Sequence, residues 1–104
     1  GGVIVGAFSF IIGDEPTYRV LLNGHWHADR PYGTIHRLAS KGTAHGVARV
    51  CFSFCLGIMD YVRIDTHENN HTMQSAITGY GFRKCGNIYA SNGTLRTAYD
   101  FIRP

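Results

Sequence analysis

One stretch of the sequence decides the fold, residues 34–48: Thr34-Ile35-His36-Arg37-Leu38-Ala39-Ser40-Lys41-Gly42-Thr43-Ala44-His45-Gly46-Val47-Ala48. Its first part is typical of a strand, its middle is a glycine-containing loop, and its end begins a helical pattern. A loop between a strand and a helix presents unpaired backbone N–H groups at the positive end of the helix dipole, which suits a phosphate group. The same letters also fit a plain turn, so the loop alone leaves both interpretations open.

Downstream of this stretch the sequence predicts a helix, a strand and a second helix. Apolar residues recur at helical spacing and form one predicted stripe: Val47, Val50, Cys51, Phe54, Cys55 and Ile58. A short strand over 61–65 follows, then a cap region at Asn69 and Asn70, and a helix over 71–78 that ends at Gly79. A strand-helix-strand crossover implies that the two strands lie parallel in one sheet.

The remaining segments are predicted to be strands around this parallel pair. Residues 3–12 are expected to form one buried strand, and residues 18–22 a second strand or a short irregular segment. Residues 83–90 and 95–102 flank a Ser-Asn-Gly turn and are predicted to form an antiparallel hairpin. The fold class is therefore α/β, of the α+β type, with a mixed sheet and a central parallel crossover.

Composition limits the class of protein. The 104 residues, 44% of them apolar, are expected to form a single globular domain over 1–104. The net charge of +3 comes from ten Lys and Arg residues spread along the chain, unlike the dense block of a polyanion-binding tail. Three cysteines without a C-x-x-C spacing, and no secretory signal, predict reduced thiols in the cytoplasm. The apolar run over 3–12 is too short to cross a bilayer as a helix, which needs about 20 apolar residues, so no membrane partner is expected.

The sequence from residue 32 to residue 102 also resembles the core of the GNAT-type N-acetyltransferases, in its residues and in the order of its elements. The resemblance is carried by Ile35-His36-Arg37-Leu38-Ala39, Gly46-Val47-Ala48, Arg63-Ile64-Asp65-Thr66-His67-Glu68-Asn69-Asn70, Met73-Gln74, Gly81-Phe82 and Cys85-Gly86-Asn87-Ile88-Tyr89. It implies the fold of that family and transfer of an acetyl group from acetyl-CoA to an amine. The family has one more strand and two helices before these elements, and the domain is expected to lack them.

The resemblance also implies a binding site for coenzyme A. The family's loop pattern is Gln/Arg-x-x-Gly-x-Gly/Ala, and here Gly46 and Ala48 match it while Thr43 replaces the leading residue. In the family the pantetheine arm pairs like an added strand with the first parallel strand, and an asparagine after the second strand touches it. The implied cofactor residues are Leu38, Ala39, Ser40, Thr43, Ala44, His45, Gly46, Val47, Ala48 and Asn70.

The reaction that the resemblance implies needs an acid for the departing thiolate and a base for the attacking amine. The family often has a tyrosine seven residues after the asparagine, which protonates the departing thiolate, and here that position is Ile77. Tyr80, His67 or solvent are the candidates for this acid. Attack on a thioester needs a neutral amine, so a base helps, and His36 lies on the strand that often bears the base in the family. His36 is therefore the predicted base, directly or through a water molecule.

Several other residues have simple structural interpretations. His25 and His27 would share one face of a strand, but no third ligand has a spacing typical of zinc, so no metal site is predicted. Cys51 and Cys55 are one helical turn apart on the apolar stripe and are interpreted as small core residues. The polar group over 65–68 fits a catalytic cluster and a helix cap equally well.

These observations predict an N-acetyltransferase that moves an acetyl group from acetyl-CoA to an amine of a small molecule or peptide. The alternative is a noncatalytic acyl-CoA-binding or structural relative, which the missing tyrosine and the altered loop favour. A nucleic-acid-binding module is not expected, because the sequence has no ribonucleoprotein motif and no run of basic charge. A sheet without its covering helices would expose apolar surface and an edge, so a homo-oligomer is expected.

Overall fold

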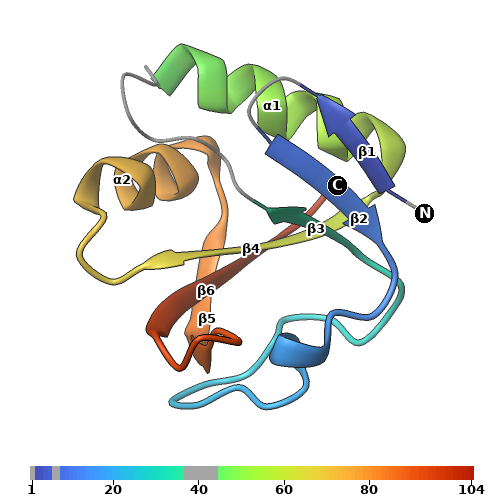
Figure 1. Cartoon of the computed structure of the whole chain (residues 1–104). Helices are drawn as coiled ribbons and strands as arrows, with labels where there is room; N and C mark the ends of the chain where they lie inside the picture. Colours follow the sequence, from blue (N-terminus) through green and yellow to red (C-terminus); the bar gives the residue numbers. More distant parts are fainter. Residues whose placement is uncertain (1, 6–7, 37–44) are drawn as a thin grey trace.

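The computed structural model describes residues 2–5, 8–36 and 45–104 of the chain. These residues form six strands, two α-helices and one short 3-10 helix (Figure 1). In chain order the elements are β1 (Gly2–Val5), β2 (Phe8–Ile12), η1 (Pro16–Tyr18), β3 (Gly33–His36), α1 (His45–Ile58), β4 (Tyr61–His67), α2 (His71–Tyr80), β5 (Arg83–Tyr89) and β6 (Leu95–Ile102).

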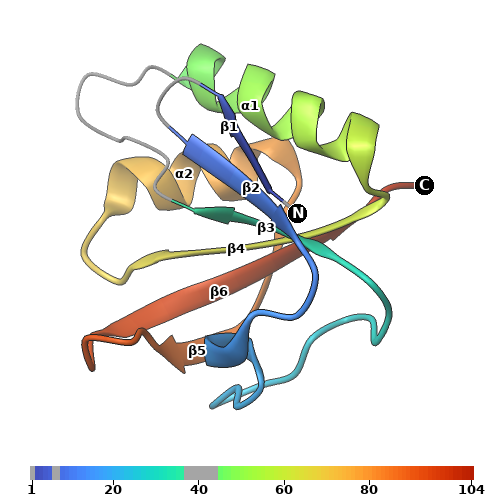
Figure 2. The same ribbon diagram turned by 45° about the vertical axis from the view of Figure 1, so that its right-hand side comes forward.

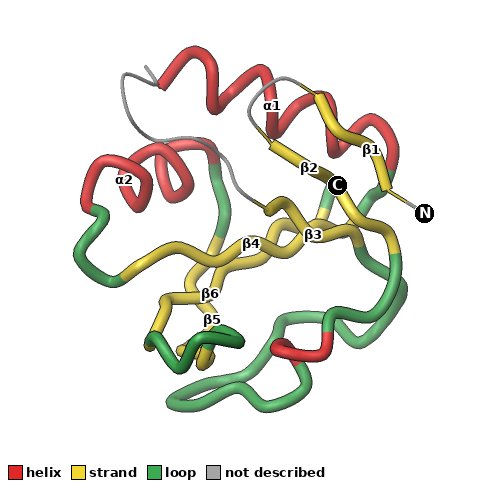
Figure 3. The backbone as a smooth tube through the Cα atoms, viewed as in Figure 1, coloured by secondary structure: helices red, strands yellow, loops and turns green. Residues whose placement is uncertain are grey.

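The strands form one mixed sheet in the order β1-β2-β3-β4-β6-β5 (Figure 3). Strands β3 and β4 are parallel and are connected through α1, and the other neighbouring pairs are antiparallel. The predicted fold class, the parallel crossover and the closing hairpin of β5 and β6 are therefore confirmed.

Both α-helices cover the same face of the sheet, as Figure 2 shows. Alternate residues of β4, Val62 and Ile64, point to this face because side chains alternate along a strand. They belong to one apolar core that also includes Phe10, Ile35, Phe52, Leu56, Met73, Ile77 and Phe82. This core holds the helices against the sheet, so the N-terminal ends of α1 and α2 are fixed relative to the end of β4.

The buried face of α1 differs from the predicted stripe. Cys51 and Cys55 are buried as predicted, but the other inward residues are Ala48, Phe52 and Leu56. Four predicted members are exposed instead: Val47, Val50, Phe54 and Ile58. The helix is apolar over most of its circumference, so the period alone did not determine which face packs on the sheet.

The first predicted strand is also corrected, because residues 3–12 contain two strands. Strands β1 and β2 pair antiparallel, with Gly2 opposite Ile11 and Val5 opposite Phe8, so the chain reverses direction between them. An apolar run of ten residues is longer than most strands. Two adjacent apolar strands give the same continuous apolar pattern as one buried strand, and the pattern therefore hid the reversal.

The segment 13–32 covers the other face of the sheet (Figure 2). For residues 18–22 the sequence left open a strand or a short irregular segment, and the irregular segment is correct. Residues 13–32 contain only η1 and an isolated bridge between Leu22 and Asn87. A second core lies under it, formed by Tyr18, Tyr32, Tyr61, Ile88 and Ala98 with Leu21, Trp26 and Ala28 packed against it.

A buried arginine joins this segment to the sheet. The Arg63 guanidinium lies 4.1 Å from the ring centre of Trp26 and 4.0 Å from that of Tyr32, within the range of cation–π attraction. It also donates hydrogen bonds to the Tyr61 hydroxyl at 3.1 Å and to the Ala28 carbonyl at 2.9 Å. The charge is thus satisfied although Arg63 is buried.

No helix in the described part of the chain is long and apolar enough to cross a bilayer.

Candidate functional site

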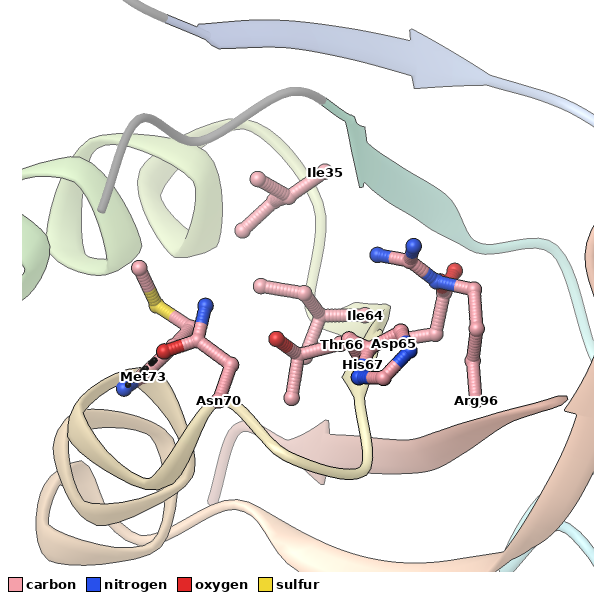
Figure 4. A pocket seen from close by; sticks show the side chains of 8 residues that line it. All are labelled: Ile35, Ile64, Asp65, Thr66, His67, Asn70, Met73 and Arg96. Carbon is pink, nitrogen blue, oxygen red and sulfur yellow. Dashed lines mark hydrogen bonds and ion pairs between the residues drawn. The ribbon is translucent and has the colours of Figure 1, made fainter. Parts of the chain in front are cut away.

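The site lies beside the last pair that the described residues of the parallel strands β3 and β4 form, Ile35 and Ile64. Their register runs from Gly33 opposite Val62 to Ile35 opposite Ile64, and β4 continues beyond it to His67. A pocket of about 190 Å³ opens at this point (Figure 4). Figure 4 shows Asn70, the N-cap of α2, and Met73 in α2 on one side of the pocket. Ile35, Ile64, Asp65, Thr66, His67 and Arg96 complete the lining.

A second and larger cavity, of about 570 Å³, lies under the segment that covers the opposite face. It is lined by Glu15, Pro16, Thr17, His36, Asp65, Ile88, Ala90, Ser91 and Arg96. Asp65 and Arg96 line both cavities. The two spaces therefore have this pair of side chains as a common part of their walls, with one space on the helix side of the sheet and one on the other side.

Asp65 is held in a fixed position in this shared wall. Its carboxylate accepts a hydrogen bond from the Tyr18 hydroxyl at 2.5 Å and another from Nε of Arg96. Burial, followed by the nearby Asp65 charge, raises the pKa of Tyr18 well above its ordinary value, so the hydroxyl stays protonated and donates. Arg96 balances the negative charge of Asp65, so this pair is a positioned and nearly neutral part of both cavity walls.

His36 lies beside a carboxylate at the edge of the larger cavity. Its Nε2 atom is 3.1 Å from Oε1 of Glu15. The other oxygen of Glu15 accepts hydrogen bonds from the backbone N–H of Thr17 at 2.9 Å and from the Thr17 hydroxyl at 3.0 Å. In a neutral ring, a hydrogen on Nε2 faces the carboxylate and leaves the lone pair of Nδ1 able to accept a proton.

His67 and Asn70 are both in the smaller pocket. Nδ1 of His67 accepts a hydrogen bond from the backbone N–H of Asn69 at 3.1 Å, which places the proton of the neutral ring on Nε2. The side-chain oxygen of Asn70 caps α2 by accepting a hydrogen bond from the N–H of Met73 at 3.1 Å. Asn70 therefore has a structural role, as the predicted cap, and its NH₂ group can still donate into the pocket.

Tyr80, the other candidate acid, is not brought together with these residues. It is the last residue of α2, and its hydroxyl lies 2.9 Å from that of Ser53 on α1. Its ring packs against Phe52, Phe82 and Phe101. The pocket is at the opposite, N-terminal end of the same helix, and Tyr80 lines neither cavity.

Part of the implied coenzyme A site lies in the first turn of α1. His45, Gly46, Val47 and Ala48 begin this helix, two residues earlier than the predicted helical pattern. Their N–H groups are the ones that an α-helix leaves without intrahelical partners. The other implied residues, Leu38, Ala39, Ser40, Thr43 and Ala44, lie outside the described residues.

Three potential metal ligands lie together elsewhere in the fold, which the sequence did not predict. They are His27, Cys85 and Asp100, whose donor atoms are all within 4.8 Å of one another. Burial would raise the pKa of Asp100, but hydrogen bonds from the His27 ring, its backbone N–H and the Tyr61 hydroxyl outweigh it and lower that pKa. Burial and the Asp100 charge raise the pKa of the Cys85 thiol.

No family model matches the sequence, and no curated protein matches it significantly. One similar solved structure is a GNAT-family acetyltransferase from Streptococcus agalactiae, with a TM-score of 0.79 and 28% identity, covering 94% of this chain and 60% of that one. Another is the NatC complex bound to Gag peptide and CoA, with a TM-score of 0.63 and 14% identity, covering 93% of this chain and 60% of that one. The chain thus spans about 60% of the length of these structures.

Proposed function

This chain has the fold of the GNAT-type acetyltransferases, and on that premise we propose that it binds acetyl-CoA and transfers the acetyl group to an amine. The single observation that carries the proposal is that two cavities share Asp65 and Arg96 in their linings. Transfer between two substrates requires a space for each and an opening through which the reacting atoms approach each other, and we propose that this opening lies beside Asp65 and Arg96. The smaller pocket would take the thioester end of acetyl-CoA, and the larger cavity would take the acceptor amine.

The first turn of α1 is proposed to bind the pyrophosphate. The N–H groups of residues 45–48 and the positive end of the helix dipole suit a dianionic group. Gly46 is exposed, and a Cβ atom there would meet no atom of the described residues within 4 Å, which supports a backbone open to a ligand. Thr43 and the backbone of residues 38–40 are proposed to complete the site.

His36 is proposed to accept the proton of the attacking amine. It lines the larger cavity, and Glu15 contacts its Nε2 atom. A carboxylate in this position fixes the orientation of the ring and stabilises the imidazolium that forms, as in other base–carboxylate pairs. The proton therefore moves to Nδ1 of His36, directly or through a water molecule.

His67 is proposed to donate to the departing thiolate. It lines the smaller pocket, and the hydrogen bond that Asn69 donates to Nδ1 leaves an N–H donor on Nε2. The residue at the family's tyrosine position, Ile77, is fully buried in the core and has no proton to give. Tyr80 stays an alternative donor only if the thiolate lies at the far end of α2.

The noncatalytic alternative is favoured by one specific observation, the burial of Ile77 at the position of the usual acid. A noncatalytic relative would keep the pyrophosphate site at α1 and the pocket beside β4. It would bind acetyl-CoA without transferring the acetyl group, so binding and turnover must be measured separately.

The proposed compartment is the cytoplasm, where the free cysteines Cys51, Cys55 and Cys85 would stay reduced. The acceptor is proposed to be an amine of a small molecule or a peptide. A homo-oligomer stays a proposal, supported by the exposed apolar residues Val47, Val50, Phe54 and Ile58 along α1.

Two measurements on the same protein test the proposal. Acetyl-CoA at millimolar concentration should raise the melting temperature, because a ligand that binds only the folded state stabilises it by mass action. Release of free thiol from acetyl-CoA should then increase with amine concentration across a panel of polyamines, amino acids and peptides. Binding without amine-dependent release would favour the noncatalytic relative, and no change in melting temperature would contradict both.

A further inference from the structure

A polar cluster on the covered face of the sheet has the composition of a metal site. His27 comes from the segment 13–32, Cys85 from β5 and Asp100 from β6. Cys85 and Asp100 are buried, and the side chain of His27 is only 17% exposed. None of the three lines the two cavities assigned to acetyl transfer, so this cluster is separate from that site.

The backbone is arranged to bring Cys85 into this cluster. Lys84 pairs with Tyr99 and Gly86 pairs with Ala98, so Cys85 is an extra residue that forms a β-bulge in β5. A bulge changes the direction of the side chain it carries. Here that side chain places Sγ 3.4 Å from Nδ1 of His27.

The segment that carries His27 is held closely against the same bulge. A Cβ atom on Gly24 would lie 1.8 Å from the carbonyl oxygen of Cys85, so only glycine allows this approach. The backbones of Leu22 and Asn87 exchange two hydrogen bonds of 2.8 Å beside it. The fold thus fixes the distance between the His27 segment and Cys85.

Two of the three donor atoms, Oδ1 of Asp100 and Sγ of Cys85, contact the third, Nδ1 of His27. Nδ1 of His27 is 2.6 Å from Oδ1 of Asp100 and 3.4 Å from Sγ of Cys85. A single hydrogen on that nitrogen can serve only one of these two contacts. A divalent cation would serve all three atoms at once, since imidazole, thiolate and carboxylate are all ligands of zinc.

The surrounding groups match those expected around a metal ligand. Oδ2 of Asp100 accepts hydrogen bonds from the Tyr61 hydroxyl and from the backbone N–H of His27, both at 2.8 Å, so Oδ1 is left for the cation. Such outer contacts orient the ligands of metal sites. A cavity of about 270 Å³ lined by His27 and Asp100 gives access and leaves room for a fourth ligand.

We propose that His27, Cys85 and Asp100 form a three-ligand site for Zn²⁺, with a fourth position open to the 270 Å³ cavity. Tetrahedral zinc with bonds of about 2.0 Å requires roughly 3.3 Å between nitrogen and oxygen ligands. The His27 and Asp100 atoms would therefore separate by about 0.7 Å, a small movement for an irregular segment. Bound zinc would tie the segment 13–32 to β5 and β6.

The test uses the untagged chain, freed of metal with EDTA and titrated with Zn²⁺ against a chromophoric chelator. We expect one tightly bound equivalent, and with Co²⁺ as the probe a thiolate-to-metal charge-transfer band and the intense visible bands of a tetrahedral ion. Cys85→Ser and His27→Gln should each weaken binding at least about 10-fold, a loss typical of metal-site substitutions. Cys51→Ser, which alters another buried cysteine, and His25→Gln, which alters the neighbouring histidine, should bind as the wild type does.

Three results would overturn the proposal. They are the lack of saturable Zn²⁺ binding, a Co²⁺ complex without a thiolate band, and unchanged affinity in a folded Cys85→Ser variant. If Cys85→Ser does not fold by circular dichroism, the Co²⁺ spectrum of the wild type and of Cys51→Ser still decides, because only Cys85 should produce the band. Acetyl-CoA binding is measured on the same samples, so failure of the zinc site and failure of the acetyl-transfer proposal are distinguishable.

Discussion

His36 ends strand β3, Glu15 precedes the 3-10 helix η1, and their Nε2 and Oε1 atoms lie 3.1 Å apart. Glu15 is itself fixed, because its carboxylate caps η1 through Thr17 and its backbone N–H donates to the Tyr32 hydroxyl at 2.8 Å. The imidazole thus has a carboxylate partner whose position is set by the covering segment. A histidine in this arrangement can be tested as a base separately from any role in binding.

His36→Ala should lower kcat by something like 10²- to 10⁴-fold, the range of general acid–base catalysis, with little change in the KM for acetyl-CoA. Added imidazole should restore part of the rate. Glu15→Gln should have a smaller effect in the same direction, since it removes the charge and keeps a polar contact. Steady-state thiol release measures both, with the exposed His71→Ala as the matched control. A loss confined to the KM of the acceptor would show that His36 only contacts the acceptor.

His67→Ala should lower kcat by about 10-fold or more, because the thiolate would lose its donor. Tyr80→Phe should change kcat by less than about 2-fold, because the Tyr80 hydroxyl contacts Ser53 and not the pocket. Acetyl donors whose thiols have lower pKa values should reduce the effect of His67→Ala, since a better leaving group needs less protonation. Thiol-release assays measure kcat for both variants. A larger loss of kcat in Tyr80→Phe than in His67→Ala would assign the acid to Tyr80.

Gly46→Glu should abolish the rise in melting temperature that acetyl-CoA causes, because a carboxylate would occupy the proposed pyrophosphate position. Gly57→Glu is the matched control, since both glycines are in α1 and a Cβ atom on either would meet none of the described atoms within 4 Å. Both variants should therefore fold, and only Gly57→Glu should keep a shift of several degrees. Thermal unfolding with and without acetyl-CoA measures this. An equal shift in the two variants would place the pyrophosphate elsewhere.

Asp100→Asn should make the protein less stable at pH 7 and less sensitive to acid. The pKa of Asp100 is lowered from its ordinary value of 3.8, because hydrogen bonds to the carboxylate outweigh the effect of burial. A lowered folded-state pKa stabilises the fold fully above the unfolded-state pKa, and this contribution is lost as the pH falls through the folded-state pKa. We expect a loss of about 1–3 kcal/mol at neutral pH that shrinks below pH 4. Urea unfolding of metal-free protein at pH 7, 5, 4 and 3 measures it, with the exposed Asp29→Asn as control. The prediction would be contradicted if the free energies of unfolding of the wild type and Asp100→Asn differed by the same amount at every pH.

The sequence was sufficient for the elements whose local signals agree with their packing. The cap at Asn70 and the turn between β5 and β6 were each visible as residue types that favour one backbone conformation. The predicted end of the second helix at Gly79 was wrong, because α2 continues to Tyr80 and its C-cap is Gly81, whose φ of 125° favours glycine. The sequence was insufficient for α1, where apolar residues lie on most faces of the helix. The exposed Val50 and the buried Phe52 of α1 have the same apolar character, and only the sheet decides which of them is covered.

The candidate site shows the same division. His36 and His67 could be proposed from their places in the chain, because the ends of parallel strands meet at one edge of the sheet. Glu15 could not, since its contact with His36 depends on the path of the irregular segment 13–32. The cluster of His27, Cys85 and Asp100 depends on that path and on a bulge, neither of which has a spacing that a sequence reveals.

The close approach of Gly24 and Gly86 has a consequence for how this chain can vary. A Cβ atom on Gly86 would lie 2.3 Å from the carbonyl oxygen of Leu22, and one on Gly24 would lie 1.8 Å from that of Cys85. Each added carbon would collide with a backbone atom. A clash with a side chain could be relieved by a second substitution to a smaller residue, but a clash with the backbone could not. In a library of all single replacements, both positions should accept glycine alone, while Gly57 on the open side of α1 should tolerate many residues. Gly24 and Gly86 are therefore expected to stay unchanged during neutral evolution, because a substitution elsewhere in the chain could not compensate for their replacement.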